Sequence, residues 1–299
     1  MTTRKKAAKA SKKGAKAPRK MSARAALSVA TNARKATAER VRALVEAPQA
    51  ILESDENLQQ LLTVVRNTEE PVQVRLEAID ALATAAFAVA TFEPYRNDYI
   101  ATLQEVVDDP NQEIRERALG LLVAEKNKFA QKKLLDGLKN PAKALVLPEK
   151  ALQLLSYDVH TEAYAAARDI AKDPPNDLAK QEALRLLAAD PNSTKMFEEL
   201  LRDKDEKRAV RQVAASALNS LAPEKLQEHA REILLDNSEY EDIQATSLTA
   251  VKQYGDEEEV AKDKALLKSV NRLSTAAKSP KYKKSAKEFL AAYSEKEEK

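Results

Sequence analysis

The chain has 299 residues, a length that suits about two ordinary domains or one continuous repeat array. Trp and Cys are absent and only four glycines occur, which excludes disulfides, thiolate metal sites, Cys nucleophiles and the Gly-rich loops that cradle nucleotide phosphates. The net charge of +3 conceals an asymmetry, because residues 1–38 carry twelve cations and no acid, and the other 38 basic and 47 acidic residues give the rest about −9.

Residues 1–21 are predicted to form a disordered basic arm, since a Lys-, Ala- and Pro-rich segment buries too little apolar surface to offset the entropy of ordering. The arm resembles the tails of linker histones and of some bacterial nucleoid proteins. It is expected to contact DNA or RNA, to act as a targeting segment, or to do neither. The candidate nucleic-acid contacts are Arg4, Lys5, Lys6, Lys9, Lys12, Lys13, Lys16, Arg19 and Lys20, with Lys126, Lys128, Lys132 and Lys133 farther along the chain.

Residues 22–55 are predicted to be a helical N-terminal extension or cap, with one Ala-rich helix over 22–46 that ends before Pro48. No apolar stretch approaches the roughly 20 residues that cross a bilayer, so no membrane span is expected. The expected location is the cytoplasm, with association with a nucleoid or chromatin and organelle targeting left open.

From residue 56 to residue 293 the sequence alternates two helices per unit. First helices carry Leu or Val at helical spacing, as at Leu58, Leu61 and Val65, and proline-containing turns separate them from the second helices. Residues 294–299 are predicted to be a charged tail. The second helices are predicted at 72–90, 111–125, 148–157, 177–189, 206–221, 239–254 and 280–293.

Each second helix opens with one short pattern: an apolar residue, a cation, two variable residues and a small residue. Clear copies are Val74–Ala78, Ile114–Ala118 and Val210–Ala214, and Leu147–Ala151 is a degenerate one. The second position of the pattern falls at 75, 115, 148, 180, 211, 244 and 283. Recurrence at 31 to 40 residues is typical of a solenoid, in which each unit buries its apolar face only against its neighbours.

These features resemble HEAT repeats, the two-helix units of α-solenoids, over roughly residues 56–293. The resemblance implies an all-α solenoid of about seven helical pairs, with a ladder of hydrogen bonds between acids in the turns and cations six residues on. The implied ladder residues are Glu69, Arg75, Asp109, Arg115, Lys180, Asp205, Arg211, Gln244 and Lys283. Pro148 and Gln244 replace the cation, so interruptions of the ladder are expected at these two positions.

No residue set points to catalysis, a metal or a cofactor. The two histidines, His160 and His229, are interpreted as a residue at a helix start and a residue on a solvated helix face. The aromatic residues Phe87, Phe92, Tyr95 and Tyr99 are predicted to pack in the core at the first junction between units.

The sequence therefore favours a non-enzymatic interaction scaffold that binds a protein partner on the surface lined by its second helices. The alternative is a DNA-binding chromosome- or nucleoid-associated protein that uses the arm and Lys-rich repeat faces. A HEAT-like lyase or DNA-repair enzyme is the remote alternative.

Overall fold

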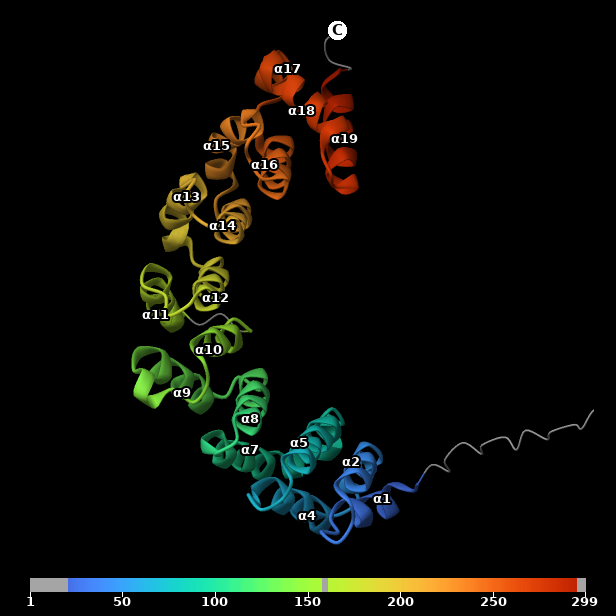
Figure 1. Cartoon of the computed structure of the whole chain (residues 1–299). Coiled ribbons are helices and arrows are strands. Elements are labelled where there is room, and N and C mark those ends of the chain that lie inside the picture. Colours follow the sequence, from blue (N-terminus) through green and yellow to red (C-terminus); the bar gives the residue numbers. More distant parts are fainter. Residues whose placement is uncertain (1–20, 158–160, 295–299) are drawn as a thin grey trace, which may run out of the picture. The chain divides into compact units, whose positions relative to one another are not determined.

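The structure is a computed structural model that describes residues 21–157 and 161–294, and within these ranges every regular element is helical (Figure 1). The expected disordered arm lies outside the described residues, apart from its last residue, and so does most of the C-terminal tail. The chain divides into two compact units, Met1–Ala118 and Leu119–Lys299. No helix in the described ranges is long and apolar enough to span a membrane.

The first unit contains three pairs of helices, with short helices between them. Its helices are α1 (Ala23–Ala30), α2 (Thr37–Glu46), α3 (Pro48–Ile51), α4 (Asp55–Arg66), α5 (Val72–Ala86), α6 (Val89–Phe92), α7 (Arg96–Glu105) and α8 (Gln112–Ala124), whose last residues lie in the second unit. Two single turns of 3₁₀ helix, η1 (Glu93–Tyr95) and η2 (Val106–Asp108), flank α7.

The second unit contains five further pairs. Their helices are α9 (Lys128–Lys139), α10 (Pro148–Leu155), α11 (Thr161–Lys172), α12 (Asp177–Leu187), α13 (Thr194–Arg202), α14 (Arg208–Leu221), α15 (Pro223–Leu235), α16 (Glu241–Tyr254), α17 (Glu257–Lys262), α18 (Lys264–Ala276) and α19 (Pro280–Ser294). The 3₁₀ turns are η3 (Pro141–Lys143) and η4 (Pro191–Ser193). The prediction of seven helical pairs after residue 56 is confirmed, as is the all-α solenoid class.

The N-terminal segment differs from its prediction. The single helix predicted over residues 22–46 is two helices, α1 and α2, which pack against each other, and α2 also packs on α5. The break falls at residues 31–36, where the Asn32 side chain accepts a hydrogen bond from the backbone N–H of Arg34 at 3.0 Å. This local bond competes with helical hydrogen bonding, so the Ala-rich stretch turns back and forms an additional pair.

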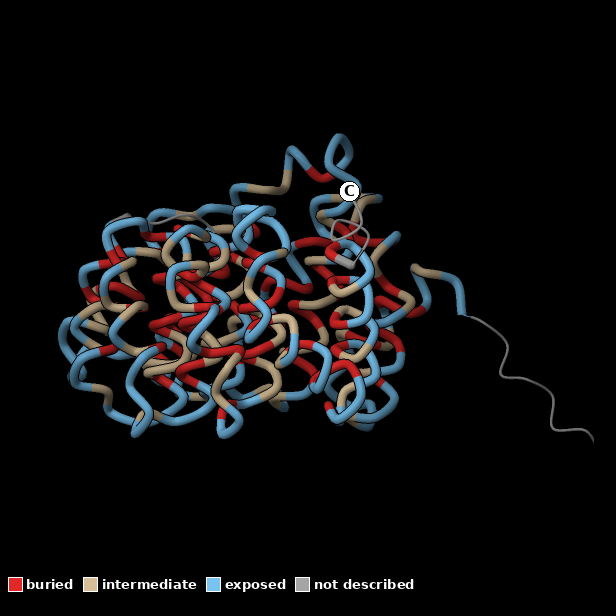
Figure 2. Tube along the Cα trace, turned by 90° about the horizontal axis from the view of Figure 1, so that it is seen from above, coloured by how far each residue is buried: buried red, intermediate tan, exposed pale blue. Residues whose placement is uncertain are grey.

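Buried residues run between the helices of each unit, and exposed residues cover the outside (Figure 2). The second helices share one register of burial: Ala78 and Ala214 are buried, and so are the residues one, three and four positions after each of them. The small side chains of Ala78 and Ala214 allow neighbouring helices to approach closely. The same register recurs at Ala151, Ala183 and Ser247, so burial is provided by sequential neighbours, as in a solenoid.

Candidate functional site

The second helices of several helical pairs carry a buried cation that links one pair to the next. In the first unit, Arg40 Nε donates to the carbonyl oxygen of Ala30 at 2.8 Å, and its Nη1 donates to Glu70 Oε2 at 2.5 Å. Arg75 repeats this arrangement in the next helical pair, with Nε donating to the Val65 carbonyl at 2.9 Å and Nη2 donating to Asp109. Each arginine therefore occupies a slot between the first helix of its own pair and the turn inside the following pair.

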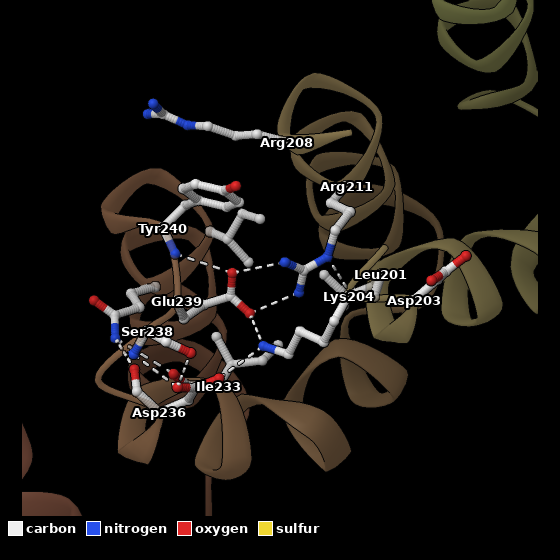
Figure 3. Close-up of polar contacts among 12 residues, drawn as sticks. Leu201, Asp203, Lys204, Arg208, Arg211, Ile233, Asp236, Ser238, Glu239 and Tyr240 are labelled. Atoms are coloured by element: carbon white, nitrogen blue, oxygen red, sulfur yellow. Dashed lines mark hydrogen bonds and ion pairs between the residues drawn. The ribbon is translucent and has the colours of Figure 1, made fainter. Parts of the chain in front are cut away.

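The same slot is filled by Arg211 in the second unit (Figure 3). Its Nε donates to the Leu201 carbonyl at 3.0 Å, and its two terminal nitrogens donate to Glu239 at 2.9 and 2.6 Å. Glu239 also accepts from Lys204 Nζ and from the backbone N–H of Tyr240. Lys180 is a shorter version of the ladder cation and pairs with Glu206.

The charges of this cluster are fixed by hydrogen bonds. Burial acts to raise the pKa of Glu239, but the hydrogen bonds from Arg211 and Lys204 outweigh it, and the pKa is lowered. Hydrogen bonds from Lys204 and Ser238 lower the pKa of Asp236 to about 2. Both carboxyl groups are therefore ionised at neutral pH, and they hold one helical pair to the next.

Of the three acids that six-residue spacing predicts, Asp109 makes a ladder contact, with Arg75. The other ladder acids are Glu70, Glu206 and Glu239, whereas the predicted Glu69 and Asp205 make no ladder contact within the described residues. Arg115 donates to the carbonyls of Asp109 and Pro110 in its own turn. Within the described residues Lys283 makes no ladder contact, and Gln244 donates to the carbonyls of Asp236 and Ile233 of its own helical pair.

The ladder slot between α9, α10 and the turn after α11 lacks both of its charged partners. By the burial register, Ala151 corresponds to Ala78 and Ala214, so Pro148 stands where those helices carry the arginine. Proline is well suited to the first position of a helix, and α10 begins at Pro148, one turn later in register than α5 and α14.

The acid is missing from this slot as well. Glu70 and Glu239 each lie three residues after the Asn or Asp that follows the first helix, and the corresponding residue after Asp173 is Asn176. The Asn176 side chain caps α12 by accepting from the backbone N–H of Ala179 at 2.8 Å, and its amide nitrogen donates to Glu149 of α10 at 3.2 Å. The arginine and the glutamate that fill the slots at Arg40 and Arg211 thus have no counterpart at these two positions.

A cavity of about 470 Å³ occupies the slot instead. Its wall is mainly apolar, and it includes Leu134, Leu138, Val146, Pro148, Ile170 and Pro174. Gly137 permits the close approach of the segment before α10, since a Cβ at this position would lie 3.0 Å from the Cα of Ala144. We call this cavity the apolar pocket. Its size falls within the range of sites that receive a ligand or an anchoring side chain.

Two charged residues and two exposed apolar residues border the apolar pocket. Lys133 and Asp173 line it, and the Lys133 ammonium lies 5.5 Å from the centroid of the Phe129 ring. Phe129 is 39% exposed, and Leu147, between the lining residues Val146 and Pro148, is 55% exposed. Both exposed side chains thus adjoin lining residues, Phe129 through Lys133 and Leu147 through its neighbours in sequence.

The remaining candidates do not assemble a second charged site. Lys126, Lys128 and Lys132 are exposed, and Arg4 to Lys20 and His160 lie outside the described residues. His229 Nε2 lies 3.3 Å from Glu198 Oε1. Within residues 21–157 and 161–294 no group of three or more His, Cys, Asp or Glu side chains is arranged to hold a metal ion.

The predicted aromatic cluster is divided between the core and the surface. Phe92 and Tyr99 are buried and meet edge to face, with ring centroids 5.5 Å apart. Phe87, by contrast, is 86% exposed. The prediction of core packing is therefore wrong for Phe87, because α5 ends at Ala86 and the chain turns away from the core there.

No protein family and no curated protein matches the chain. Among solved structures, the complex of CpcE and CpcF of phycocyanin lyase from Nostoc sp. PCC7120 is similar with a TM-score of 0.42 and 15% identity, over 89% of this chain and 98% of that one. Human deoxyhypusine hydroxylase in complex with glycerol is similar with a TM-score of 0.35 and 14% identity, over 83% of this chain and 98% of that one.

These neighbours correct one expectation. A lyase complex and a hydroxylase are both named among structures similar to this chain, which contradicts the prediction of a non-enzymatic scaffold. The repeat architecture and the absence of familiar catalytic motifs are thus no ground for excluding catalysis, because fold and function are separate properties. The DNA-binding alternative finds no support, and neither it nor the non-enzymatic character of the scaffold is retained.

Proposed function

We propose that this chain binds a protein partner that inserts an apolar side chain into the apolar pocket between α9, α10 and α11. The observation that carries the proposal is the slot at Pro148. Equivalent slots at Arg75 and Arg211 are filled by a buried guanidinium, whereas this one is an open cavity of about 470 Å³ with an apolar wall.

The energetics favour an apolar anchor. Transferring a large aliphatic or aromatic side chain from water into such a site is worth about 1.5–3 kcal/mol. A protein partner is favoured over a small molecule because the exposed apolar side chains of Phe129 and Leu147, which adjoin lining residues, are available for contacts outside the pocket. Interfaces commonly consist of a central buried anchor surrounded by contacts that exclude water.

The assignment of the units to HEAT repeats is part of the same proposal. Its support is the recurrence of one contact, in which a cation on a second helix donates to the carbonyl ten residues earlier and to an acid of the next turn. This contact is made by Arg40, Arg75 and Arg211.

The test is capture of partners from native lysate by the full chain and by variants, with quantification by mass spectrometry. Ile170→Lys places a charge in the pocket wall, and Val45→Lys makes the same kind of change at an exposed site on α2. We expect one set of proteins to be lost with Ile170→Lys and retained with Val45→Lys, both variants keeping the wild-type circular dichroism spectrum.

A photo-crosslinking residue in place of Ala144, which lines the pocket, provides direct evidence of contact. The same proteins should form covalent adducts from this position, and the adducts should disappear when Ile170→Lys is added. Retention of every captured protein by Ile170→Lys would refute the proposed function.

A further inference from the structure

The junction between the α15–α16 pair and the α18–α19 pair lacks the cation of the ladder. Gln244 of α16 stands at the position that Arg211 occupies in α14, because each lies three residues before the small residue that opens the shared register of burial. The Gln244 amide nitrogen donates to two carbonyls of its own helical pair. It is neutral and shorter than a guanidinium, so it does not replace the charged contact to the next pair.

The turn of the following pair supplies no acid to this junction. Glu70, Glu206 and Glu239 each lie three residues after the residue that follows the first helix of their pair. The residue that follows α18 is Ala277, and three residues later stands Pro280. The turn consists of Ala, Lys, Ser and Pro, so it carries a cation where the other turns carry a carboxylate.

A cavity of about 690 Å³ lies at this junction. Its wall comes from the start of α14, the turn between α15 and α16, and the end of α18 with the turn that follows. Three cations line it, and all three are exposed: Arg208, Arg272 and Lys278. We call this cavity the basic slot. As at Pro148, an opening accompanies an interruption of the ladder, but this wall is polar and charged.

The two carboxylates in the wall of the basic slot already have hydrogen-bond donors. Glu239 accepts from Arg211 and Lys204, which lie outside the wall. Glu241 accepts from the backbone N–H groups of residues 278 and 279 at 2.6 and 3.2 Å. With three cations against two carboxylates, the wall itself has an excess of positive charge.

Two of the three cations are available to a ligand. Arg208 is engaged, because it donates to Asp242 at 2.9 Å and its guanidinium lies 5.1 Å from the centroid of the Tyr240 ring (Figure 3). Arg272 makes one weak contact, at 3.4 Å to a hydroxyl of its own helix. Within residues 21–157 and 161–294 neither Arg272 nor Lys278 makes an ion pair. Their exposed donors can therefore bind an anion that enters the slot.

We propose that the basic slot binds the carboxylate of an Asp or Glu side chain from an acidic segment of a partner protein. Arg272 and Lys278 donate to this carboxylate, which compensates the excess positive charge of the wall. A carboxylate is the group that enters the slots at Arg40, Arg75 and Arg211, and here the chain's own turn does not provide it.

The volume of the slot fits this occupant, since it accommodates a side chain together with part of the peptide that carries it. Leu273 and Ala276 in the wall provide apolar contacts for the aliphatic part of the acidic residue. The inference goes beyond the proposed function, because it concerns another slot, other helices and a charged group, whereas the apolar pocket takes an apolar side chain.

The experiment begins with random dodecapeptides displayed on phage and selected on the full chain. Phage that also bind the Arg272→Glu/Lys278→Glu variant are removed. We expect the remaining peptides to share an Asp or Glu at one position. Replacing that residue by Asn or Gln should weaken binding to the wild type about 10-fold by isothermal titration calorimetry, because hydrogen bonds between charged groups are lost.

A double-mutant cycle assigns the acid to its partners. Arg272→Gln/Lys278→Gln should bind the acidic peptide and its amide form equally, so that the 10-fold difference disappears. Lys264→Gln/Lys268→Gln is the matched control, because it removes the same charge from exposed positions of α18 outside the wall. The control should keep the full difference, and both variants should keep the wild-type circular dichroism spectrum.

Four outcomes would overturn the inference. They are the absence of selected peptides, the absence of a shared acidic residue, an equal loss in the slot variant and its control, and binding tightened more than about 10-fold by phosphoserine at the shared position. The third would show general attraction to a basic surface, and the fourth would assign the slot to phosphate groups. Ile170→Lys should leave the affinity of these peptides unchanged, so failure at the basic slot and failure at the apolar pocket are told apart.

Discussion

Glu239→Gln should destabilise the second unit far more than the loss of an ordinary surface carboxylate. The Glu239 and Arg211 side chains are 0% and 3% exposed, and Glu239 accepts hydrogen bonds from Arg211, Lys204 and the backbone of Tyr240. The glutamine is nearly isosteric, but it turns an N–H₂ group toward two cations and leaves the buried guanidinium without its counter-charge. Breaking a buried pair in this way costs about 3–5 kcal/mol.

The assay is urea unfolding followed by circular dichroism, with hydrogen exchange to locate the loss in α14, α15 and α16. Exchange is needed because repeat arrays can unfold unit by unit. Asp177→Asn is the control. It removes an ion pair to Lys207 whose side chains are 66% and 62% exposed, and such pairs contribute about 0–1 kcal/mol.

The pH dependence gives the sign of the effect. The pKa of Glu239 is lowered in the folded state, so its contribution is fully present above the unfolded value near 4.5 and is lost as pH falls through that value toward the folded one. Glu239→Gln should therefore flatten the loss of stability on acidification below about pH 4.5. A cost below about 1 kcal/mol, or an unchanged acid profile, would refute the assignment of Glu239 as a buried ladder acid.

Three further substitutions test other parts of the structure. Arg75→Met should cost about 3–5 kcal/mol and raise hydrogen exchange in α5, since Asp109 is left 3% exposed without its arginine; protection equal to that of the wild type would contradict this. Tyr282→Phe should change the unfolding free energy by less than about 1 kcal/mol or increase it, because the hydroxyl has no partner, and a larger loss would show a bond there. Gly255→Ala should lower the melting temperature at a cost of about 1–3 kcal/mol, because its Cβ would lie 2.5 Å from the Val251 carbonyl oxygen; an unchanged melting temperature would show that the turn adapts.

The helices and their pairing follow from the sequence because apolar spacing and proline turns recur with every unit. The ladder glutamates are harder to predict, because their position is set by the distance from the Asn or Asp that follows the first helix and not by the distance from the cation. Asn67 accepts from the backbone N–H of Glu69 at 3.1 Å, and this turn directs the next residue, Glu70, toward Arg40. Asp236 accepts from Ser238 in the same way and places Glu239 against Arg211. An Asn or Asp followed three residues later by Glu is the signal that six-residue spacing misses.

The apolar pocket could be predicted only in part. Pro148 marks the lost cation in the sequence, but no periodicity gives the path of residues 140–147, which form the turn η3 and much of the pocket wall. The unpaired buried oxygens of Asn219 and Tyr282 have no sequence signal, because the lack of a hydrogen-bond partner depends on distances in space. A similar Asn or Tyr on any exposed helix face would have the same neighbours in sequence.

The apolar pocket lies where the ladder is interrupted, and this arrangement limits the energetic cost. In a repeat array the stability of a unit depends on itself and its immediate neighbours, so a slot without an ion pair weakens one junction and not the whole. The Arg211–Glu239 pair holds α14 to the turn before α16, away from the helices that line the apolar pocket. Glu239→Gln should therefore lower the stability of α14 to α16 and leave partner capture in place. Ile170→Lys should remove capture and keep the wild-type circular dichroism spectrum, and this opposite pairing separates a binding residue from a structural one.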